Sequence, residues 1–240
     1  MRGSVLKLAR LLFLAACAVG SSLITRASVA YFTEGDLHPF VLEKEPLPLE
    51  QVWLTALHVH VVAAALALPA CLLLVSRWLL RSFPRAHRWL GRVTGAVILC
   101  ALVPSGAWLA LFAKGGLAST AGFLLSGAIV FCAMLNGIRT ARARDFVSHR
   151  RSVLHVLAQL SVAVTSRALL IAFDRAGVSA DAAYWAALWG PVLASAAVVE
   201  LVTRTRSVVP SLTPRTPRSR HEVLAEIVRF RARPVLVAAR

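Results

Sequence analysis

Acidic side chains are scarce in this sequence, and several short motifs of catalysis are absent from it. Its 240 residues contain 11 Asp and Glu. They include no Ser-His-Asp set in a plausible order, no Gly-rich Walker-type loop, no His-Glu-x-x-His pair and no Cys-x-x-Cys pair. These absences argue against a hydrolase and against an ATP-driven pump.

Cysteine is also rare, and its four positions lie in separate apolar runs. No two of them have the spacing of metal ligands, and none lies in a polar loop where an exported protein would form a disulfide. We therefore expect Cys17, Cys71, Cys100 and Cys132 to act as small apolar packing residues.

Tyrosine is rarer still, with two residues, although the formal net charge is +16. The basic residues lie between the apolar runs and in the C-terminal tail, and no basic surface with interleaved aromatic side chains can be identified. We expect no nucleic-acid partner.

Long apolar runs are what the sequence has in abundance. It is 58% hydrophobic with a mean hydropathy of +0.70, which is too apolar for a soluble domain. Six runs are long enough, at about 1.5 Å per residue, to cross about 30 Å of hydrocarbon. The sequence therefore predicts an all-α polytopic transmembrane helical bundle, with spans at residues 11–32, 52–75, 93–113, 120–138, 153–173 and 183–202.

Lys and Arg are concentrated on one side of these spans. Most of them lie before the first span, in the loop between the second and third spans, in the loop between the fourth and fifth spans, or after the sixth span. The positive-inside rule then predicts that both termini are cytoplasmic in a multi-pass protein of the bacterial inner (plasma) membrane. Its partners would be the lipid bilayer and, through the basic loops and tail, anionic inner-leaflet lipids.

The same pattern divides the chain into four parts. Residues 1–33 form a first transmembrane helix or signal anchor, and residues 34–51 form an external acidic loop. Residues 52–202 form a five-helix transmembrane core, and residues 203–240 form a basic, Pro- and Arg-rich cytoplasmic tail. Around Val223 the tail is expected to be either a short amphipathic helix on the inner leaflet or a solvated segment.

The first span has an alternative interpretation. Its basic start, apolar middle and small residues at Ser28–Ala30 also fit a cleaved signal peptide, which would leave five spans. We favour a retained helix because the apolar run continues to Phe32 and is then long enough to span.

Three histidines lie near the predicted cytoplasmic side: His87 just before the third span, His149 just before the fifth, and His155 about one turn inside it. A haem b between helices needs two imidazoles from facing helices and cations for its propionates. His87 with His149 or His155, and Arg88 or Arg92, fit that pattern. A quinone, an anionic head group or a small anion would use the same residues, and so would interfacial anchors without a ligand.

Other ionisable residues lie within the spans. His58, His60 and Arg167 reach a similar depth on the predicted outer side. Because positions two apart on a helix differ by about 200°, the two histidines cannot both face one ligand squarely. Together with Arg167 they predict either a proton-relay or substrate-anion site, or a structural hydrogen-bond cluster. Glu200, near the inner end of the sixth span, is expected to pair with an inner arginine.

Several short motifs in this sequence follow one another in an order and at a spacing that are typical of a known family. They are His58 or His60, His87-Arg88-x-x-Gly91-Arg92, the turn from Gly115-Gly116 to Gly122-Phe123, Asp145 to His149-Arg150, and Arg167. In this the sequence resembles, from about residue 57 to residue 172, the bacterial membrane protein family known as domain of unknown function 2306. The resemblance implies a multi-span topology and a set of residues, but no reaction.

The chain also departs from the family pattern. Leu68-Pro69-Ala70 stands where a Gly-Pro is expected, and Ser152-Val153-Leu154 replaces an aromatic residue and a Met. A looser likeness connects it with dihaem b-type membrane cytochromes and ferric reductases.

These observations favour a membrane ligand-binding or electron-transfer protein that uses His87, Arg88, Arg92, His149 and His155, with haem b or a quinone as the ligand. The alternatives are a small transporter or permease-like protein with a His58, His60 and Arg167 relay, and a structural membrane protein without chemistry. Any redox partner or homo-oligomer stays open.

Overall fold

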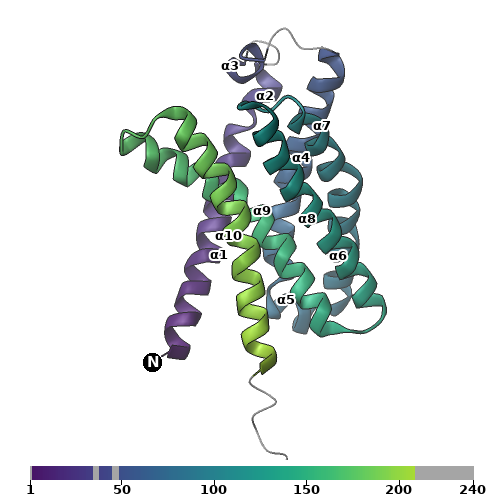
Figure 1. The fold of residues 1–240 in the computed structure, drawn as a ribbon. Helices are drawn as coiled ribbons and strands as arrows, with labels where there is room; N and C mark the ends of the chain where they lie inside the picture. Colours follow the sequence, from purple (N-terminus) through teal and green to yellow (C-terminus); the bar gives the residue numbers. More distant parts are fainter. Residues whose placement is uncertain (1, 35–37, 45–48, 209–240) are drawn as a thin grey trace, which may run out of the picture. The chain divides into compact units, whose positions relative to one another are not determined.

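A computed structural model describes residues 2–34, 38–44 and 49–208 of the chain. Every regular element in these ranges is a helix (Figure 1). The helices are α1 (Arg2–Ala27), α2 (Ala30–Thr33), α3 (Pro39–Leu42), α4 (Glu50–Leu74), α5 (Arg77–Ser82), α6 (Pro84–Val97), the π-helix η2 (Ile98–Leu102), α7 (Val103–Ala110), α8 (Gly116–Arg142), α9 (Phe146–Arg175) and α10 (Ala180–Val208).

Six helical segments are long and apolar enough to cross a membrane, which confirms the predicted all-α bundle of six spans. They are Leu8–Thr33, Glu50–Leu74, Pro84–Ala110, Gly116–Arg142, Phe146–Arg175 and Ala180–Arg204. The third and fifth begin earlier than predicted, so His87 and His149 lie inside helices and not just before them.

The chain forms two compact units, Met1–Leu201 and Val202–Arg240. In the second unit, the described residues continue α10 to Val208. The helix expected around Val223 lies outside the described residues.

Local sequence explains where several helices begin. Pro84 opens α6 at a position where its missing N–H costs no hydrogen bond. Asp145 caps α9, because its carboxylate accepts a 3.1 Å hydrogen bond from the Ser148 N–H. Hydrogen bonding from the Ser148 hydroxyl and, second to it, from the Ser148 N–H lowers the pKa of Asp145. Gly115 and Gly116, at φ of +86° and +68°, make a left-handed turn into α8, whereas Gly122 and Phe123, predicted to belong to the same turn, lie inside α8.

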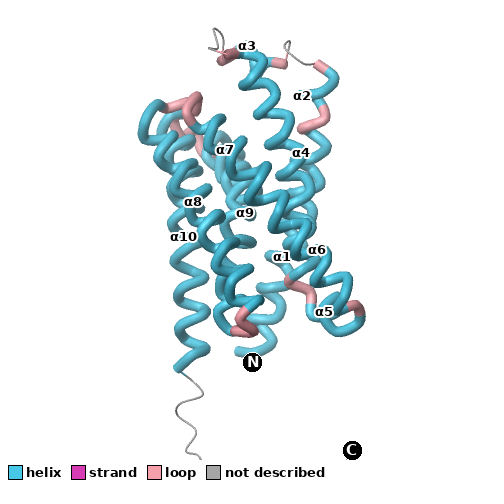
Figure 2. Tube along the Cα trace, turned by 90° about the vertical axis from the view of Figure 1, so that its right-hand side faces the viewer, coloured by secondary structure: helices cyan, strands magenta, loops and turns pink. Residues whose placement is uncertain are grey.

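The core lies where the second to fifth spans meet. Ala63, Ala67, Leu68 and Cys71 of α4 pack there with Ile98 and Leu102 of η2, Val130 and Met134 of α8, and Val156 and Leu157 of α9. Small side chains on α4 allow neighbouring helices to approach closely, as in other membrane bundles. Figure 2, turned by 90° from Figure 1, shows these helices side by side.

The connections define two ends of the bundle. We call the end with residues 75–83 and 143–145 the basic end, and the end with residues 38–44, 111–115 and 176–179 the acidic end. At the acidic end a second cluster forms, in which Val41 of α3 packs on Trp53, Leu54 and Leu57 of α4. Both ends carry histidines that the sequence singled out.

Candidate functional site

A three-residue ionic cluster joins α9 to α10 near the basic end. His155 Nε2 lies 2.9 Å from Glu200 Oε1, and the Arg151 guanidinium binds the same carboxylate through both Nε and Nη2. Arg151 and His155 are four residues apart on α9, so they lie on one face of the helix. The pairing expected of Glu200 with an inner arginine is thereby confirmed, with Arg151 as the partner.

The cluster is partly open. The side chains of Arg151, Glu200 and His155 are 49%, 31% and 15% exposed. An ionised carboxylate can only accept hydrogen bonds, so His155 Nε2 donates in this arrangement. The other ring nitrogen, Nδ1, is buried and has no hydrogen-bond partner among the described residues.

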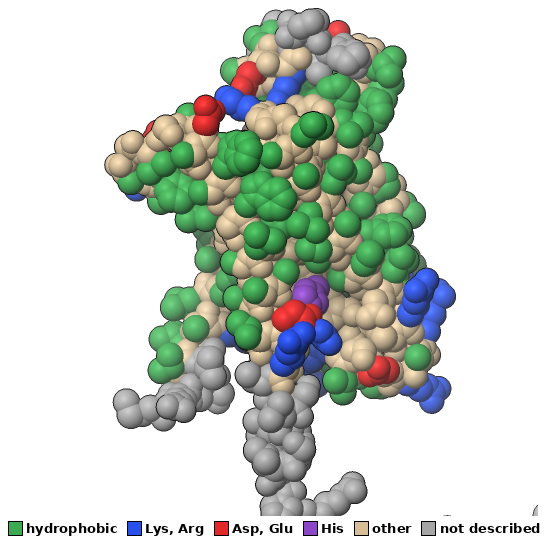
Figure 3. Space-filling model, viewed as in Figure 1, with side chains coloured by type: hydrophobic (Ala, Val, Ile, Leu, Met, Phe, Trp, Pro, Cys, Tyr) green, Lys and Arg blue, Asp and Glu red, His purple; other side chains and the backbone are tan. Residues whose placement is uncertain are grey.

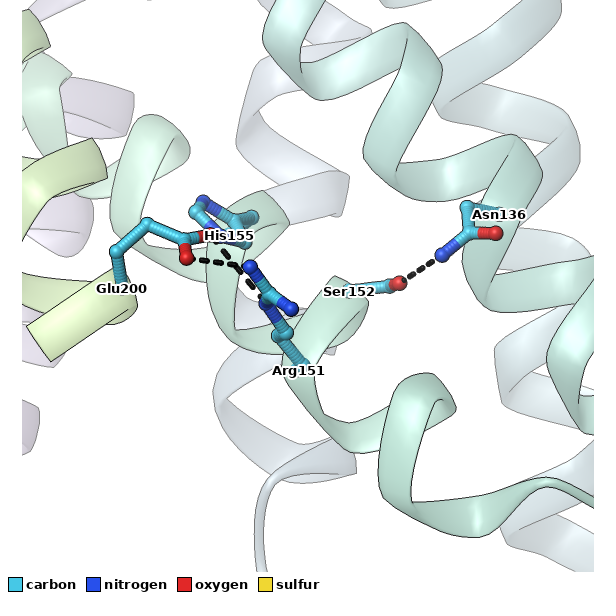
Figure 4. A network of polar contacts seen from close by, with 5 residues as sticks. All are labelled: Asn136, Arg151, Ser152, His155 and Glu200. Carbon is cyan, nitrogen blue, oxygen red and sulfur yellow. Dashed lines mark hydrogen bonds and ion pairs between the residues drawn. The ribbon is translucent and has the colours of Figure 1, made fainter. Parts of the chain in front are cut away.

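A pocket of about 290 Å³ lies against the cluster and reaches across to α8. Asn136 Nδ2 of α8 donates a 2.8 Å hydrogen bond to Ser152 Oγ of α9 (Figure 4). The lining therefore combines a cation, a carboxylate, an imidazole, hydroxyls and an amide, from Cys132, Ala133, Asn136, Ser148, Arg151, Ser152, His155 and Glu200.

The surface around such groups is mostly apolar. Figure 3 shows a broad area of hydrophobic side chains, below which a histidine lies beside acidic and basic side chains. Pocket residues such as Cys132 and Arg151 are exposed at the side of the bundle, within helices that can span the membrane. The pocket therefore lies against the exposed surface of α8 and α9.

Gln159 fixes α9 one turn further along the same face. Its side chain is 3% exposed, its Nε2 donates to the Val192 carbonyl and to Ser195 Oγ, both at 3.0 Å, and its Oε1 accepts from Ser126 Oγ at 2.9 Å. One side chain thus joins α8, α9 and α10. It gives the pocket fixed walls, because interhelical hydrogen bonds hold helices in register within a membrane.

The other histidines of the basic end are placed differently. His149 Nδ1 lies 2.8 Å from the Gly137 carbonyl and donates to it, which leaves Nε2 as an acceptor. His87 is half-buried on α6, its Nδ1 has no partner among the described residues, and it lies within electrostatic range of His149. The three histidines thus have different surroundings: His149 binds the Gly137 carbonyl, His87 Nδ1 has no partner among the described residues, and His155 turns to Glu200.

Arg88 and Arg92 are exposed, whereas His87 faces the bundle interior. Adjacent residues on a helix point about 100° apart, which accounts for the separation of Arg88 from His87. The two arginines lie on the lateral surface of α6, outside the pocket described above.

The three residues of the predicted outer relay have separate partners. His58 Nε2 lies 3.0 Å from the Tyr31 carbonyl, and its ring stacks on Phe32. His60 Nδ1 lies 3.2 Å from the Leu102 carbonyl in η2, and Arg167 donates to the Ala163 carbonyl of its own helix. Within the described part of the chain, no hydrogen bond joins any two of the three.

A larger hollow of about 460 Å³ lies between α4 and the third span. Its lining is apolar apart from short neutral side chains and Gln51, and it includes no histidine, arginine or acid. The hydroxyls of Thr55 and Ser105 already donate to carbonyls of their own helices. This hollow offers no chemistry comparable with that of the His155 pocket.

Sequence reasoning missed Arg151, Ser152 and Asn136 as pocket residues. The only local signal was the four-residue spacing of Arg151 and His155, which places both on one face of α9. Asn136 gave no signal, because a single amide in an apolar run does not reveal which helix it faces.

Comparison with known proteins identifies the family. The sequence matches the family described as "Predicted membrane protein (DUF2306)" over residues 57–203, more than half of the chain, and the chain belongs to that family. No curated protein and no solved structure matches it. The matched region contains α8, α9 and most of α10, and so the whole His155 pocket.

Proposed function

We propose that this family member binds the polar head group of an uncharged, membrane-dissolved amphiphile, of the quinone class, in the His155 pocket. The observation that carries the proposal is a set of hydrogen-bonding side chains around Glu200 that opens sideways from a membrane-spanning bundle. Such a site has the usual features of a small-molecule pocket, an apolar frame with a few convergent polar groups.

The size of the pocket favours a head group. Pockets for small molecules usually hold about 300–1,000 Å³. At about 290 Å³ this one is at the lower end, so it admits a substituted ring while an attached alkyl chain stays in the bilayer.

The charge balance of the lining favours an uncharged head group. The carboxylate of Glu200 neutralises the Arg151 guanidinium, which leaves little net charge to hold a phosphate. Quinone oxygens accept hydrogen bonds, and the lining offers donors in Arg151, Asn136 and the hydroxyls of Ser148 and Ser152.

Cys132 provides a direct test, because it lines the pocket and is exposed. The protein would carry Cys100→Ala, which removes the other exposed thiol in the described part of the chain. In lipid nanodiscs, decylubiquinone, whose ring is fully substituted, should slow alkylation of Cys132 by N-ethylmaleimide in a saturable way, as followed by mass spectrometry.

Substitutions of pocket residues test whether this protection of Cys132 comes from decylubiquinone bound in the pocket. Arg151→Gln or Glu200→Gln should weaken decylubiquinone binding about tenfold, since hydrogen bonds to charged groups contribute about 1.5–3 kcal/mol. Arg142→Gln, an exposed arginine at the same end but outside the lining, is the matched control and should bind as the wild type does. Absence of saturable protection in the wild type would contradict the proposal.

Electron transfer through haem b is a second candidate function, supported by His149. Its Nδ1–H is held by the Gly137 carbonyl and its Nε2 is an acceptor, the arrangement that ligating imidazoles commonly have. His87 would be the other ligand. Among the described residues no group of three or more His, Cys, Asp or Glu is arranged to hold a metal ion, so two-histidine ligation is the form to test.

The haem test is the visible spectrum of protein purified after expression with haem precursors. A Soret band that His149→Ala abolishes, while the folded yield is kept, is the expected result. A colourless wild-type protein would contradict this second candidate. The transporter alternative has no comparable support, because His58, His60 and Arg167 bind separate backbone carbonyls.

A further inference from the structure

Three arginines form a stripe on the lateral surface of α6. Arg85, Arg88 and Arg92 are spaced by three and four residues, so they share one helix face, and all three are exposed. From Arg85 to Arg92 the stripe covers about 10 Å along the helix. It lies within the candidate span Pro84–Ala110, so it extends from the end of the span into its first turns.

The stripe has no partner within the described part of the chain. The ion pairs described there join Lys114 with Glu43, and Arg151 and His155 with Glu200. On the other side of α6, His87 is half-buried and Thr94 is buried, so that side of the helix faces the bundle and the arginines do not. A charged side chain on a lipid-facing span is costly unless an anion or water reaches it.

Exposed tryptophans lie on α6 beside the stripe and on the adjoining helix α5. Trp89, on the same side of α6, is 68% exposed. In the adjoining helix α5, Trp78 is 66% exposed and makes an edge contact with Phe83, with ring centroids 5.4 Å apart. Figure 2 shows α5 next to the start of α6. Tryptophan prefers the head-group level of a bilayer, so these residues place Arg85 and Arg88 at that level.

We propose that Arg85, Arg88 and Arg92 bind the phosphate group of an anionic phospholipid. Guanidinium groups bind phosphate oxygens through paired, charge-assisted hydrogen bonds. The lipid phosphate supplies the negative charge that no described side chain provides to these arginines. The acyl chains would lie along the apolar part of the span that follows Arg92. The site is on α6 and is separate from the His155 pocket of α8, α9 and α10.

Lipid titration followed by native mass spectrometry tests the site on the full chain in detergent. The probes are phosphatidylglycerol and phosphatidylcholine with the same acyl chains. The wild type should bind phosphatidylglycerol about tenfold more tightly or better, because each basic residue at a membrane surface adds to the attraction for anionic lipid. The triple variant Arg85→Gln, Arg88→Gln, Arg92→Gln should lose that preference.

A matched triple variant distinguishes binding at a specific site from a general effect of the protein's net charge. Arg139→Gln, Arg142→Gln, Arg144→Gln removes the same charge from the same end of the bundle and should keep the preference for phosphatidylglycerol. Equal losses in the two triple variants would overturn the proposal, because net charge would then explain the binding. Equal affinity of the wild type for both lipids would overturn it as well. The single variant Arg92→Gln, expected to give a partial loss, serves if the first triple variant does not fold.

Discussion

At the acidic end of the bundle, histidine and lysine side chains are each held by a hydrogen bond or an ion pair. At the basic end, histidine and arginine side chains line a pocket. At the acidic end Lys44 donates to the Phe112 carbonyl at 2.9 Å, Lys114 pairs with Glu43 at 2.9 Å, and His58 binds the Tyr31 carbonyl. At the basic end Arg151 and His155 share Glu200 beside a pocket, and His155 Nδ1 has no partner among the described residues.

The difference lies in the groups that these side chains meet. At the acidic end Lys44 and His58 each bind one backbone carbonyl, Lys114 pairs with Glu43, and Val41 packs on Trp53. A single carboxylate on α10 holds two side chains of α9 at the basic end, and the polar atoms of α8 lie across the pocket from it. The same residue types therefore bind single partners at one end and leave polar atoms along a pocket at the other.

Removing the largest side chain of the acidic-end cluster should have the greatest effect on stability. Trp53 is 2% exposed, and Trp53→Ala should lower the free energy of unfolding by about 3–5 kcal/mol through the cavity it leaves. Denaturant titration in detergent measures the loss, with the exposed Trp89→Ala as the control. Decylubiquinone affinity should not change. A loss of affinity equal to that of Arg151→Gln would mean that the two ends are not independent.

Adding a methyl group next to His60 should have an intermediate effect on the free energy of unfolding. A Cβ at Gly106 would lie 2.9 Å from His60 Cε1, so Gly106→Ala should cost about 1–3 kcal/mol by overpacking. Most of that cost should vanish in a His60→Ala background, which a double-mutant cycle measures. Gly127→Ala, where no atom lies within 4 Å of the added Cβ, is the control. An equal cost with and without His60 would show that the histidine does not fill this space.

The exposed ion pair of the acidic end should give the smallest effect, visible as a pH dependence. The hydrogen bond and charge of Lys114 hold the pKa of Glu43 below its ordinary value of 4.5. The pair therefore stabilises the fold above that ordinary value, and its contribution is lost as the pH falls through the lowered pKa. Both side chains are about half exposed, so the contribution is small and weakens with salt.

Thermal unfolding of the wild type and of Glu43→Gln, compared from about pH 3 to pH 8, tests this dependence. The wild type should be the more stable protein at neutral pH, and the two should converge in acid. A difference that grows as the pH falls would contradict the assignment.

Much of the fold could be predicted because its determinants are local. Hydropathy marks each span, and Pro84, Asp145 and Gly115 mark helix starts through properties of single residues. The predicted starts of the third and fifth spans were late, because polar first turns such as Arg85 to Arg92 are helical without being apolar. Amphipathic helix ends of this kind give no hydropathy signal.

The sequence by itself determined the six spans, the basic and acidic ends, and the rule that His58 and His60 face different partners. Only the tertiary structure decided that His155 meets Glu200, that Asn136 faces Ser152, and that His149 binds the Gly137 carbonyl. The physical reason is that hydropathy and helix periodicity are properties of one segment. The partner of a side chain depends on the rotation and axial register of two packed helices, which no single segment contains.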